Sequence, residues 1–399
     1  MKWTTKPLAK VADFCLGKML DDKKNRGEAL PYLANINVRW GEFDLENLRE
    51  MRFEHDEMDR YGLKYGDIVM CEGGEPGRCA IWKESVPGMM IQKALHRIRP
   101  RDCLDHRFLF YSFLHKGKIG TFAPLCTGAT IRHLPRQRLA KVEIEFPQLE
   151  VQRGIADILS AYDDLIENNR RRMALLEQSA RHLYEEWFVR LRFPGHERSR
   201  VADGVPQGWE RGSVSDFYET ASGGTPSRTN PDFFTGEIPW VKTQELLNTF
   251  ITDTDEKITE DALKKSAAKL FPERTVLVAM YGATIGQIGI LATPATSNQA
   301  CCAIIPRGIR GSYIYAFLFF LENKPKLVSL SMGAAQNNVN QQTIRSYPMV
   351  MPPRLLAERF YATLGPVFDQ WLNLQHQTEK LRAARDLLLP RLMSGEIAV

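Results

Sequence analysis

The sequence predicts an α+β protein: two pseudo-repeated α/β domains, separated by an antiparallel two-helix coiled coil. Three observations support this fold class. The chain of 399 residues repeats itself, short apolar segments alternate with glycine turns, and two long segments carry a heptad pattern. A chain of this length is also too long for one compact core and suits two domains.

The internal repeat keeps its order along the chain. Residues 30–37, LPYLANIN, match residues 238–245, IPWVKTQE, and the segment 66–81 matches 274–290. Shorter matches follow in the same order: 92–94 with 298–300, 128–129 with 333–334, and 147–149 with 353–355.

Within each copy, short strands flank a glycine turn. Residues 67–70 and 79–82 read as two strands around the turn at 73–77, and the turn at 282–286 holds the same place in the second copy. The dense apolar runs at 106–114 and 313–321 read as buried helices, and the second run is too short to cross a bilayer.

Each copy ends in an amphipathic stripe with steps of four and three residues, which predicts a long helix paired with another helix. A single helix lying on a core is the alternative. Asn169 is a polar residue on the first stripe, and Pro366 marks a possible start or kink in the second. The first stripe contains Ile155, Leu159, Tyr162, Ile166, Asn169, Met173, Leu176, Ala180, Leu183 and Trp187, and the second contains Phe360, Leu364, Val367, Trp371, Leu374, Thr378 and Leu381.

These patterns divide the chain into five parts. The first domain is expected at 1–148, the first long helix at 149–191, a linker rich in Pro, Gly and charge at 192–208, the second domain at 209–352 and the second long helix at 353–399.

Composition excludes several classes of protein. No stretch has 18 uninterrupted apolar residues, so we expect no signal peptide and no membrane span. The seven cysteines lack a C-x-x-C spacing and the eight histidines are dispersed, which argues against a metal site and for free thiols in a reducing, cytoplasmic setting.

The net charge of +5 is unevenly distributed. Between Lys93 and Lys141 many Arg and Lys residues face only Asp102 and Asp105 in the local sequence. Such a bias is typical of a surface for a polyanion, although charge runs are also common on solvated faces.

Catalytic motifs are missing. The chain has no G-x-x-x-x-G-K-[ST] loop for ATP, and Asn230-Pro231-Asp232-Phe233 lacks the second proline of the N-P-P-Y/F methyltransferase motif. The segment after Pro231-Asp232 lacks the lysine of a PD-type nuclease centre. We therefore assign no catalytic residue and no metal ligand.

Several segments resemble the specificity subunits of type I restriction–modification systems. Residues 223–227, GGTPS, followed by 236–241, GEIPWV, resemble the opening of a target-recognition domain in that family. Residues 281–286, YGATIG, look like its G-A-T-I-G turn, and 331–338, SMGAAQNN, like its G-x-x-Q-x-N segment. Residues 352–355 and 146–152 are similar to the P-P-L-x-E-Q start of its conserved helix. The first copy departs from the pattern, with GGEPG at the turn and no GGTPS.

The resemblance implies a non-catalytic DNA-binding subunit. Each target-recognition domain would read one half of a bipartite, asymmetric site in double-stranded DNA. The paired helices would act as a spacer and dock two methyltransferase (modification) subunits, and the complex would recruit motor-nuclease (restriction) subunits. S-adenosylmethionine, ATP and Mg²⁺ are expected on those partners, and no cofactor is expected in this chain.

We expect DNA contacts from one polar loop in each domain, because Arg pairs with guanine, Asn and Gln pair with adenine, and Lys and Arg bind phosphates. The alternative is a polar cap that contacts nothing. The candidates in the first domain are Thr130, Arg132, His133, Arg136, Arg138, Lys116 and Lys118, and those in the second are Gln336, Asn337, Asn338, Asn340 and Gln341.

Two other functions stay open from the sequence. One is a self-contained DNA methyltransferase, which would bind S-adenosylmethionine alone, and the other is a coiled-coil scaffold with two domains for ligands other than DNA. Phe188 lies off the heptad stripe, so we consider it a possible contact for a methyltransferase subunit.

Overall fold

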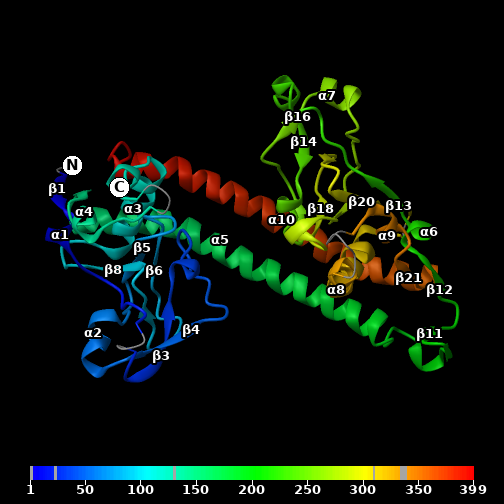
Figure 1. The fold of residues 1–399 in the computed structure, drawn as a ribbon, viewed down its shortest axis with the longest axis horizontal. Helices are drawn as coiled ribbons and strands as arrows, with labels where there is room; N and C mark the ends of the chain where they lie inside the picture. The colour runs from blue at the N-terminus through cyan, green and yellow to red at the C-terminus, as the bar shows by residue number, and fades with distance from the viewer. Residues whose placement is uncertain (1–2, 22–24, 129–131, 309–310, 333–338) are drawn as a thin grey trace. The chain divides into compact units, whose positions relative to one another are not determined.

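The computed structural model describes residues 3–21, 25–128, 132–308, 311–332 and 339–399 (Figure 1). The chain forms two compact units. The first unit combines Met1–Ile166 with Lys380–Val399, and the second consists of Glu167–Glu379. Each unit therefore contains one globule together with parts of both long helices, α5 (Leu149–Tyr184) and α10 (Arg354–Met393).

The first unit builds its globule from two main sheets and one long helix. The sheets have the strand orders β2-β8-β5-β6 and β4-β3-β7, and β1 pairs with β9. The elements are β1 (Thr4–Pro7), α1 (Leu8–Val11), β2 (Ala12–Leu16), β3 (Glu28–Leu33), η1 (Asn35–Asn37), β4 (Arg49–Phe53), η2 (His55–Glu57), α2 (Met58–Tyr61), β5 (Ile68–Cys71), β6 (Cys79–Ile81), β7 (Met90–Ile91), β8 (Leu95–Pro100), α3 (His106–Lys118), η3 (Ala123–Leu125), α4 (Arg136–Leu139) and β9 (Glu143–Phe146).

The second unit has sheets of order β13-β20-β17-β18-β15 and β16-β14-β19, and β12 pairs with β21. The long helix of its globule is α8. The elements are η4 (Glu185–Val189), η5 (His196–Arg198), β10 (Val201–Ala202), β11 (Val205–Pro206), β12 (Glu210–Ser213), α6 (Val214–Phe217), β13 (Glu219–Ser222), η6 (Pro231–Phe234), β14 (Ile238–Val241), η7 (Thr243–Glu245), β15 (Thr249–Ile251), β16 (Lys257–Ile258), α7 (Glu260–Lys265), β17 (Val276–Ala279), η8 (Gly282–Thr284), β18 (Ile288–Leu291), β19 (Thr296–Ser297), β20 (Cys301–Ile305), α8 (Tyr313–Met332), α9 (Gln341–Arg345) and β21 (Pro348–Met351).

The two units share one topology. Strand order β2-β8-β5-β6 corresponds to β13-β20-β17-β18. Each small sheet contains a parallel pair, β3 with β7 in the first unit and β14 with β19 in the second. The repeated segments also match in local structure: the side chains of Asn37 and Glu245 each accept a hydrogen bond from the backbone nitrogen three residues earlier, at 2.9 and 2.6 Å. The predicted fold class, with its two repeated domains, is confirmed.

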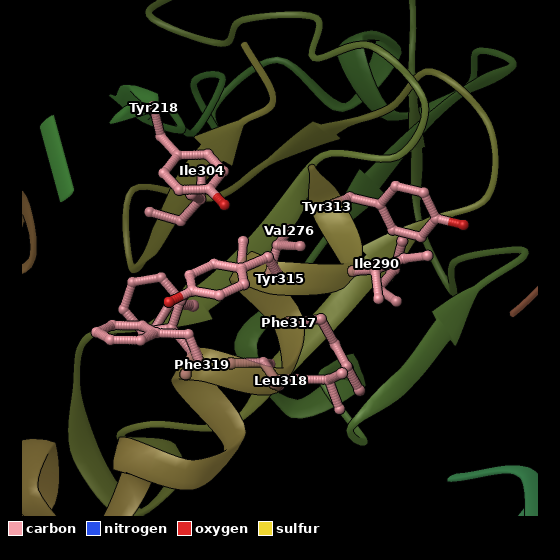
Figure 2. Close-up of a cluster of buried hydrophobic side chains, with 14 of the residues drawn as sticks. Tyr218, Val276, Ile290, Ile304, Tyr313, Tyr315, Phe317, Leu318 and Phe319 are labelled. Carbon is pink, nitrogen blue, oxygen red and sulfur yellow. The ribbon is translucent and has the colours of Figure 1, made fainter. Parts of the chain in front are cut away.

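Aromatic and aliphatic side chains of α8 fill the core of the second globule. Figure 2 shows Tyr315 and Phe319 on one side of this helix and Phe317 on the other, next to Val276 and Ile290 of the sheet. The apolar run at 313–321 is therefore a buried helix, as predicted. The helix runs on to Met332 through Pro325.

The two long helices meet in both units, in antiparallel order. In the first unit, Ile155 and Leu159 of α5 share a core with Leu389 and Leu392 of α10. In the second unit, Ala180 and Tyr184 of α5 share a core with residues near the start of α10, among them Phe360. The paired-helix prediction is confirmed.

Most of the predicted stripe is buried or half-buried. Ile155, Leu159, Ile166, Asn169, Phe360, Leu364, Trp371 and Leu374 are buried, whereas Tyr162, Met173, Leu176, Leu183, Val367 and Leu381 are half-buried. Phe368 lies beside the stripe, yet it is fully buried against Phe250 and Phe317 of the globule. Helix α10 thus packs on the globule as well as on α5, which widens its apolar face beyond a heptad seam.

Two details differ from expectation at the helix ends. Helix α10 begins at Arg354 and continues through Pro366, so the proline does not start it. Helix α5 passes at Tyr184 into a π-helical turn, Glu185–Val189, in which backbone hydrogen bonds span five residues and not four. At its start, Gln152 is fully buried and donates to the Pro147 carbonyl at 2.9 Å.

Polar groups join three helices of the first unit. Asp163 of α5 accepts hydrogen bonds from the Tyr111 hydroxyl of α3 at 2.6 Å and from Arg385 of α10 at 2.5 Å. Burial, and then the neighbouring Asp163 carboxylate, raise the pKa of Tyr111, so it remains a hydrogen-bond donor. Among the described helices, none combines the length and the apolar character that crossing a bilayer requires.

Two leucines of α10 provide a matched test of this packing. Leu364 is 2% exposed and Leu355 is 64% exposed. Leu364→Ala is expected to lower the free energy of unfolding by about 2–5 kcal/mol, because it leaves a cavity in the core. Leu355→Ala is expected to change it by less than about 0.5 kcal/mol. Urea unfolding followed by circular dichroism measures both; equal effects would contradict the assigned helix face.

Candidate functional site

The glycine turn, residues 73–77 in the first unit and 282–286 in the second, closes in the same way in both units. The Gly77 nitrogen donates to the Cys71 carbonyl at 3.0 Å, and the Gly286 nitrogen donates to the Ala279 carbonyl at 3.0 Å. Gly77 and Gly286 have φ values of 94° and 75°, which favour glycine. The sequence change from GATIG to GGEPG therefore leaves the turn's closure intact, and both turns connect antiparallel strands as predicted.

The polar loop of each unit comes later in the chain than the glycine turn. A second backbone hydrogen bond, present in both units, joins the end of this loop to a residue just before the turn. The Leu134 nitrogen donates to the Glu72 carbonyl at 2.7 Å, and the Val339 nitrogen donates to the Met280 carbonyl at 3.0 Å. The two predicted DNA-contact loops thus leave equivalent positions at one end of the large sheet in each globule.

In the first unit the loop is closed at its base. The backbones of Thr127 and His133 exchange hydrogen bonds of 2.8 Å in both directions. The His133 ring also contacts the Glu72 carboxylate, with 3.0 Å from Nδ1 to Oε2. These contacts anchor the loop. Thr130 lies outside the described residues.

The basic candidates of the first unit differ in how they are engaged. Arg132 is exposed and lines a cavity of about 520 Å³ with Trp40 and Phe122. The Arg136 guanidinium lies 5.2 Å from the centre of the Phe14 ring. Arg138 is exposed and donates to the carbonyls of residues 125 and 126 at 3.3 Å, and Lys116 is half-buried.

Lys118 forms an ion pair with Asp386 of α10, with 2.5 Å between Nζ and Oδ2. Burial opposes ionisation of this carboxyl group, but hydrogen bonds from Lys118 and Arg385 outweigh it, so the pKa of Asp386 lies below its usual range. The charge of Lys118 is therefore compensated within the unit, which makes it a weaker candidate for a DNA phosphate.

The basic stretch from Lys93 to Lys141 is less free than the local sequence indicates. Three of its arginines pair with acids distant in sequence: Arg99 binds Asp67 through two bonds of 2.7 Å, Arg101 binds Asp13 at 2.6 Å, and Arg107 binds Asp157 at 2.6 Å. Folding thus supplies counter-charges from other segments to Arg99, Arg101 and Arg107, and the interpretation of the rest of the stretch as a polyanion surface stays a prediction.

In the second unit, the described loop residues make structural contacts. Asn340 caps α9, and its side-chain oxygen accepts from the Thr343 nitrogen at 2.8 Å. The Gln341 side chain accepts from the Ser222 hydroxyl at 2.8 Å. Gln336, Asn337 and Asn338 lie outside the described residues. The amides of Asn340 and Gln341 are therefore partly occupied within the protein.

Close packing explains the two glycines of the GGTPS segment. A side chain at Gly223 would meet the Asn298 carbonyl at 2.3 Å, and one at Gly224 would meet the Ala267 carbonyl at 2.3 Å. In the first unit Gly17 and Lys18 take this place, with the same backbone hydrogen bonds. The internal repeat of the sequence did not reveal this equivalence. Its one signal was Gly17, a single glycine before β3.

Phe188 does not need a partner protein to be covered. Its ring lies 4.7 Å from that of Phe360, 5.0 Å from Tyr315 and 5.7 Å from Trp209, between ring centres. Phe188 therefore packs within the second unit, and it remains half-buried, so the suggestion that it also faces a methyltransferase subunit stays a prediction. Within the described ranges no cluster of three or more His, Cys, Asp or Glu side chains is placed to hold a metal ion.

Comparison with known proteins decides the family. A family model described as the type I restriction modification DNA specificity domain matches residues 2–178 and again residues 206–368. The chain belongs to this type I DNA specificity family. Membership confirms the resemblance drawn from the motifs, and it makes the chain the DNA-specificity component of a restriction–modification system and not its catalytic component.

Two curated members of the type I specificity family illustrate the similarity. The MjaIX specificity subunit of Methanocaldococcus jannaschii is 27% identical over 342 residues, which cover 84% of this chain and 78% of that protein. The HindI specificity subunit of Haemophilus influenzae is 23% identical, covering 72% of this chain and 74% of that protein.

A solved member of the type I specificity family has the same fold. The crystal structure of the S subunit from M. genitalium superposes with a TM-score of 0.61 at 15% identity, covering 98% of this chain and 96% of that chain. The family match does not favour a self-contained methyltransferase or a scaffold without DNA.

Asn340 offers a test that separates capping from DNA reading. Asn340→Ala is expected to destabilise the second unit by about 1 kcal/mol, because α9 loses its cap, whereas Asn340→Asp keeps the accepting oxygen. Thermal unfolding measures the stability. If Asn340 also reads a base, then Asn340→Asp alters the methylated sequence at full stability; an unchanged sequence would assign the residue to capping only.

Proposed function

We propose that each unit reads one half of a bipartite DNA target and that its polar loop and glycine turn supply the contacts. The observation that carries this proposal is the repeated anchoring of the loop: equivalent backbone hydrogen bonds hold it beside the same turn in both units. A loop anchored in this way suits recognition, because the scaffold positions side chains that differ in sequence between the two copies.

The two loops carry different chemistry, which supports an asymmetric target. The first presents Arg132 and His133, and the second is rich in Asn and Gln. Arginine binds guanine bidentately, and the carboxamides bind adenine. Arg136, Arg138 and Lys116 suit phosphate contacts, which position a domain without reading sequence.

The finer account of the partners is part of the same proposal. Two methyltransferase subunits dock on the paired helices, motor-nuclease subunits join them, and S-adenosylmethionine, ATP and Mg²⁺ belong to these chains. Exposed apolar side chains on α5 support such docking: Ile158 is 37% exposed and Leu165, two turns later, is 51% exposed. DNA as target, and the free cysteines, fit a cytoplasmic site of action.

Methylome sequencing after co-expression with a cognate type I methyltransferase subunit tests the function directly. We expect a two-part methylated motif with a gap of fixed length. A continuous motif would contradict reading by two separate units, and methylation by this chain alone would contradict its non-catalytic role.

Arg132 gives the sharpest residue-level prediction. Arg132→Ala is expected to weaken binding to DNA by about 1–3 kcal/mol and to relax only the first half-site, because a bidentate contact to a base is lost. Arg101→Ala is the matched control, since Arg101 is already paired with Asp13. Fluorescence anisotropy with the methylome-defined duplex measures affinity. Equal losses for both variants would remove Arg132 from base reading.

The helices predict the gap between the half-sites. One heptad inserted after Ile166 of α5 and another after Glu379 of α10 keep the helix pairing in each unit, because both insertions fall at the boundary between units. At about 1.5 Å per residue, seven residues add about 10 Å, or about three base pairs of DNA. Methylome sequencing is expected to show a longer gap with both half-sites unchanged; altered half-sites would contradict a spacer role.

A further inference from the structure

A pocket of about 340 Å³ lies in the second unit, where α5 ends and the linker strands β10 and β11 begin. Its apolar wall is formed by five aromatic side chains: Tyr184, Phe188, Trp209, Tyr315 and Phe319. Tyr315 and Phe319 come from one side of α8, as Figure 2 shows. Their rings are nearly parallel, with 6.4 Å between centres.

A half-buried carboxylate completes the pocket. Glu322, Asn323 and Lys326 of α8 form its polar side. Asn323 donates to the Phe319 carbonyl at 2.9 Å, and Lys326 lies 3.4 Å from the Asn323 oxygen. Within the described residues, Glu322 has no hydrogen bond or ion pair. A cation bound in the pocket would pair with this carboxylate.

An unusual backbone builds one wall of this pocket. The π-helical turn Glu185–Val189 carries Phe188, and Leu191, which also lines the pocket, has a φ of 59°. A non-glycine residue in this left-handed region costs about 1 kcal/mol or more, and both π-turns and such residues are concentrated at functional sites.

The equivalent place in the first unit is built differently. Trp3 precedes β1 as Trp209 precedes β12, and the end of α10 lies against it. There Gly395 contacts Trp3 so closely that a side chain at Gly395 would lie 2.9 Å from the indole nitrogen. Gly395 therefore leaves little room for a side chain beside Trp3. The aromatic pocket therefore belongs to the second unit and is not a requirement of the shared fold.

Two arginines of the second unit each lie between aromatic rings and a carboxylate, which is the combination of groups found in this pocket. The first example is Arg228. The Arg228 guanidinium lies 4.1 Å from the Phe234 ring centre and 5.0 Å from the Trp240 ring centre, and it pairs with Glu256 at 2.6 Å.

The second example is Arg274. It lies 4.9 Å from the Tyr313 ring centre and 5.6 Å from the Phe250 ring centre, and it pairs with Asp369 at 3.0 Å. In both examples, two aromatic rings and one carboxylate surround an arginine. The pocket at Glu322 has the rings and the carboxylate; its basic lining residue is Lys326, and no arginine lines it among the described residues.

We propose that this pocket binds an arginine side chain presented by a partner protein. The planar guanidinium stacks on the rings of Phe188 and Trp209, which line the pocket, and donates two parallel hydrogen bonds to Glu322. Lysine fits less well, because its ammonium group is strongly hydrated and does not stack. A phosphate group is disfavoured by the carboxylate and by the negative faces of the rings. This site is separate from the polar loop, so it does not depend on how DNA is read.

The test uses the full-length chain labelled with 5-fluorotryptophan, with the Trp209 resonance assigned from Trp209→Phe. The probe is the peptide acetyl-Gly-Leu-Arg-Leu-Gly-amide, and its neutral match has citrulline in place of arginine. Fluorine NMR titration is expected to shift the Trp209 resonance with the arginine peptide and to leave it almost unchanged with citrulline.

Two glutamate variants complete the design. Glu322→Gln is expected to weaken binding of the arginine peptide about tenfold, because a charge-assisted pair is lost. Glu237→Gln changes an exposed carboxylate of the same unit outside the pocket and is expected to have no effect. No shift of Trp209, equal shifts with both peptides, or equal affinity of Glu322→Gln and the parent chain would each overturn the proposal. The Trp371 resonance, which reports on the core, checks that each variant is folded.

Discussion

The antiparallel pairing of α5 with α10 is the constraint on which the rest of the structure depends. Each globule completes its core with segments from both helices: Leu389 and Leu392 join the first unit, and Ala180 and Tyr184 join the second. Neither half of the chain contains all the apolar surface that its own globule needs. Burial of these residues therefore ties the two halves into one folded protein.

A common framework carries different surfaces in the two units. Backbone hydrogen bonds at Gly77 and Gly286, and at Leu134 and Val339, are the same, although the surrounding side chains differ. Backbone bonds tolerate side-chain change, so the loops and turns diverge while their geometry is kept. The aromatic pocket around Phe188 is likewise a difference in side chains on a shared framework. In the first unit, Gly395 lies beside Trp3.

The fold was largely predictable from the sequence because its signals are periodic and local. The heptad stripes located the paired helices, and the apolar run at 313–321 located a buried helix. Phe368 was missed because a heptad seam describes contact with one partner helix, whereas α10 also packs on a globule. Three arginines of the basic stretch are neutralised by Asp13, Asp67 and Asp157, which lie far away in the sequence. Local counting of charges cannot detect such pairs, and the base-reading roles proposed for Arg132 and Asn340 stay predictions.

The shared helices also order events during synthesis. Residues 380–399 contribute to the first unit but are translated after the whole of the second globule. Ile155 and Leu159 therefore lack part of their core until Leu389 and Leu392 have left the ribosome. During that interval the nascent chain exposes apolar surface on α5. Rapid translation of residues 380–399, or a chaperone that binds α5, would therefore raise the yield of correctly folded protein.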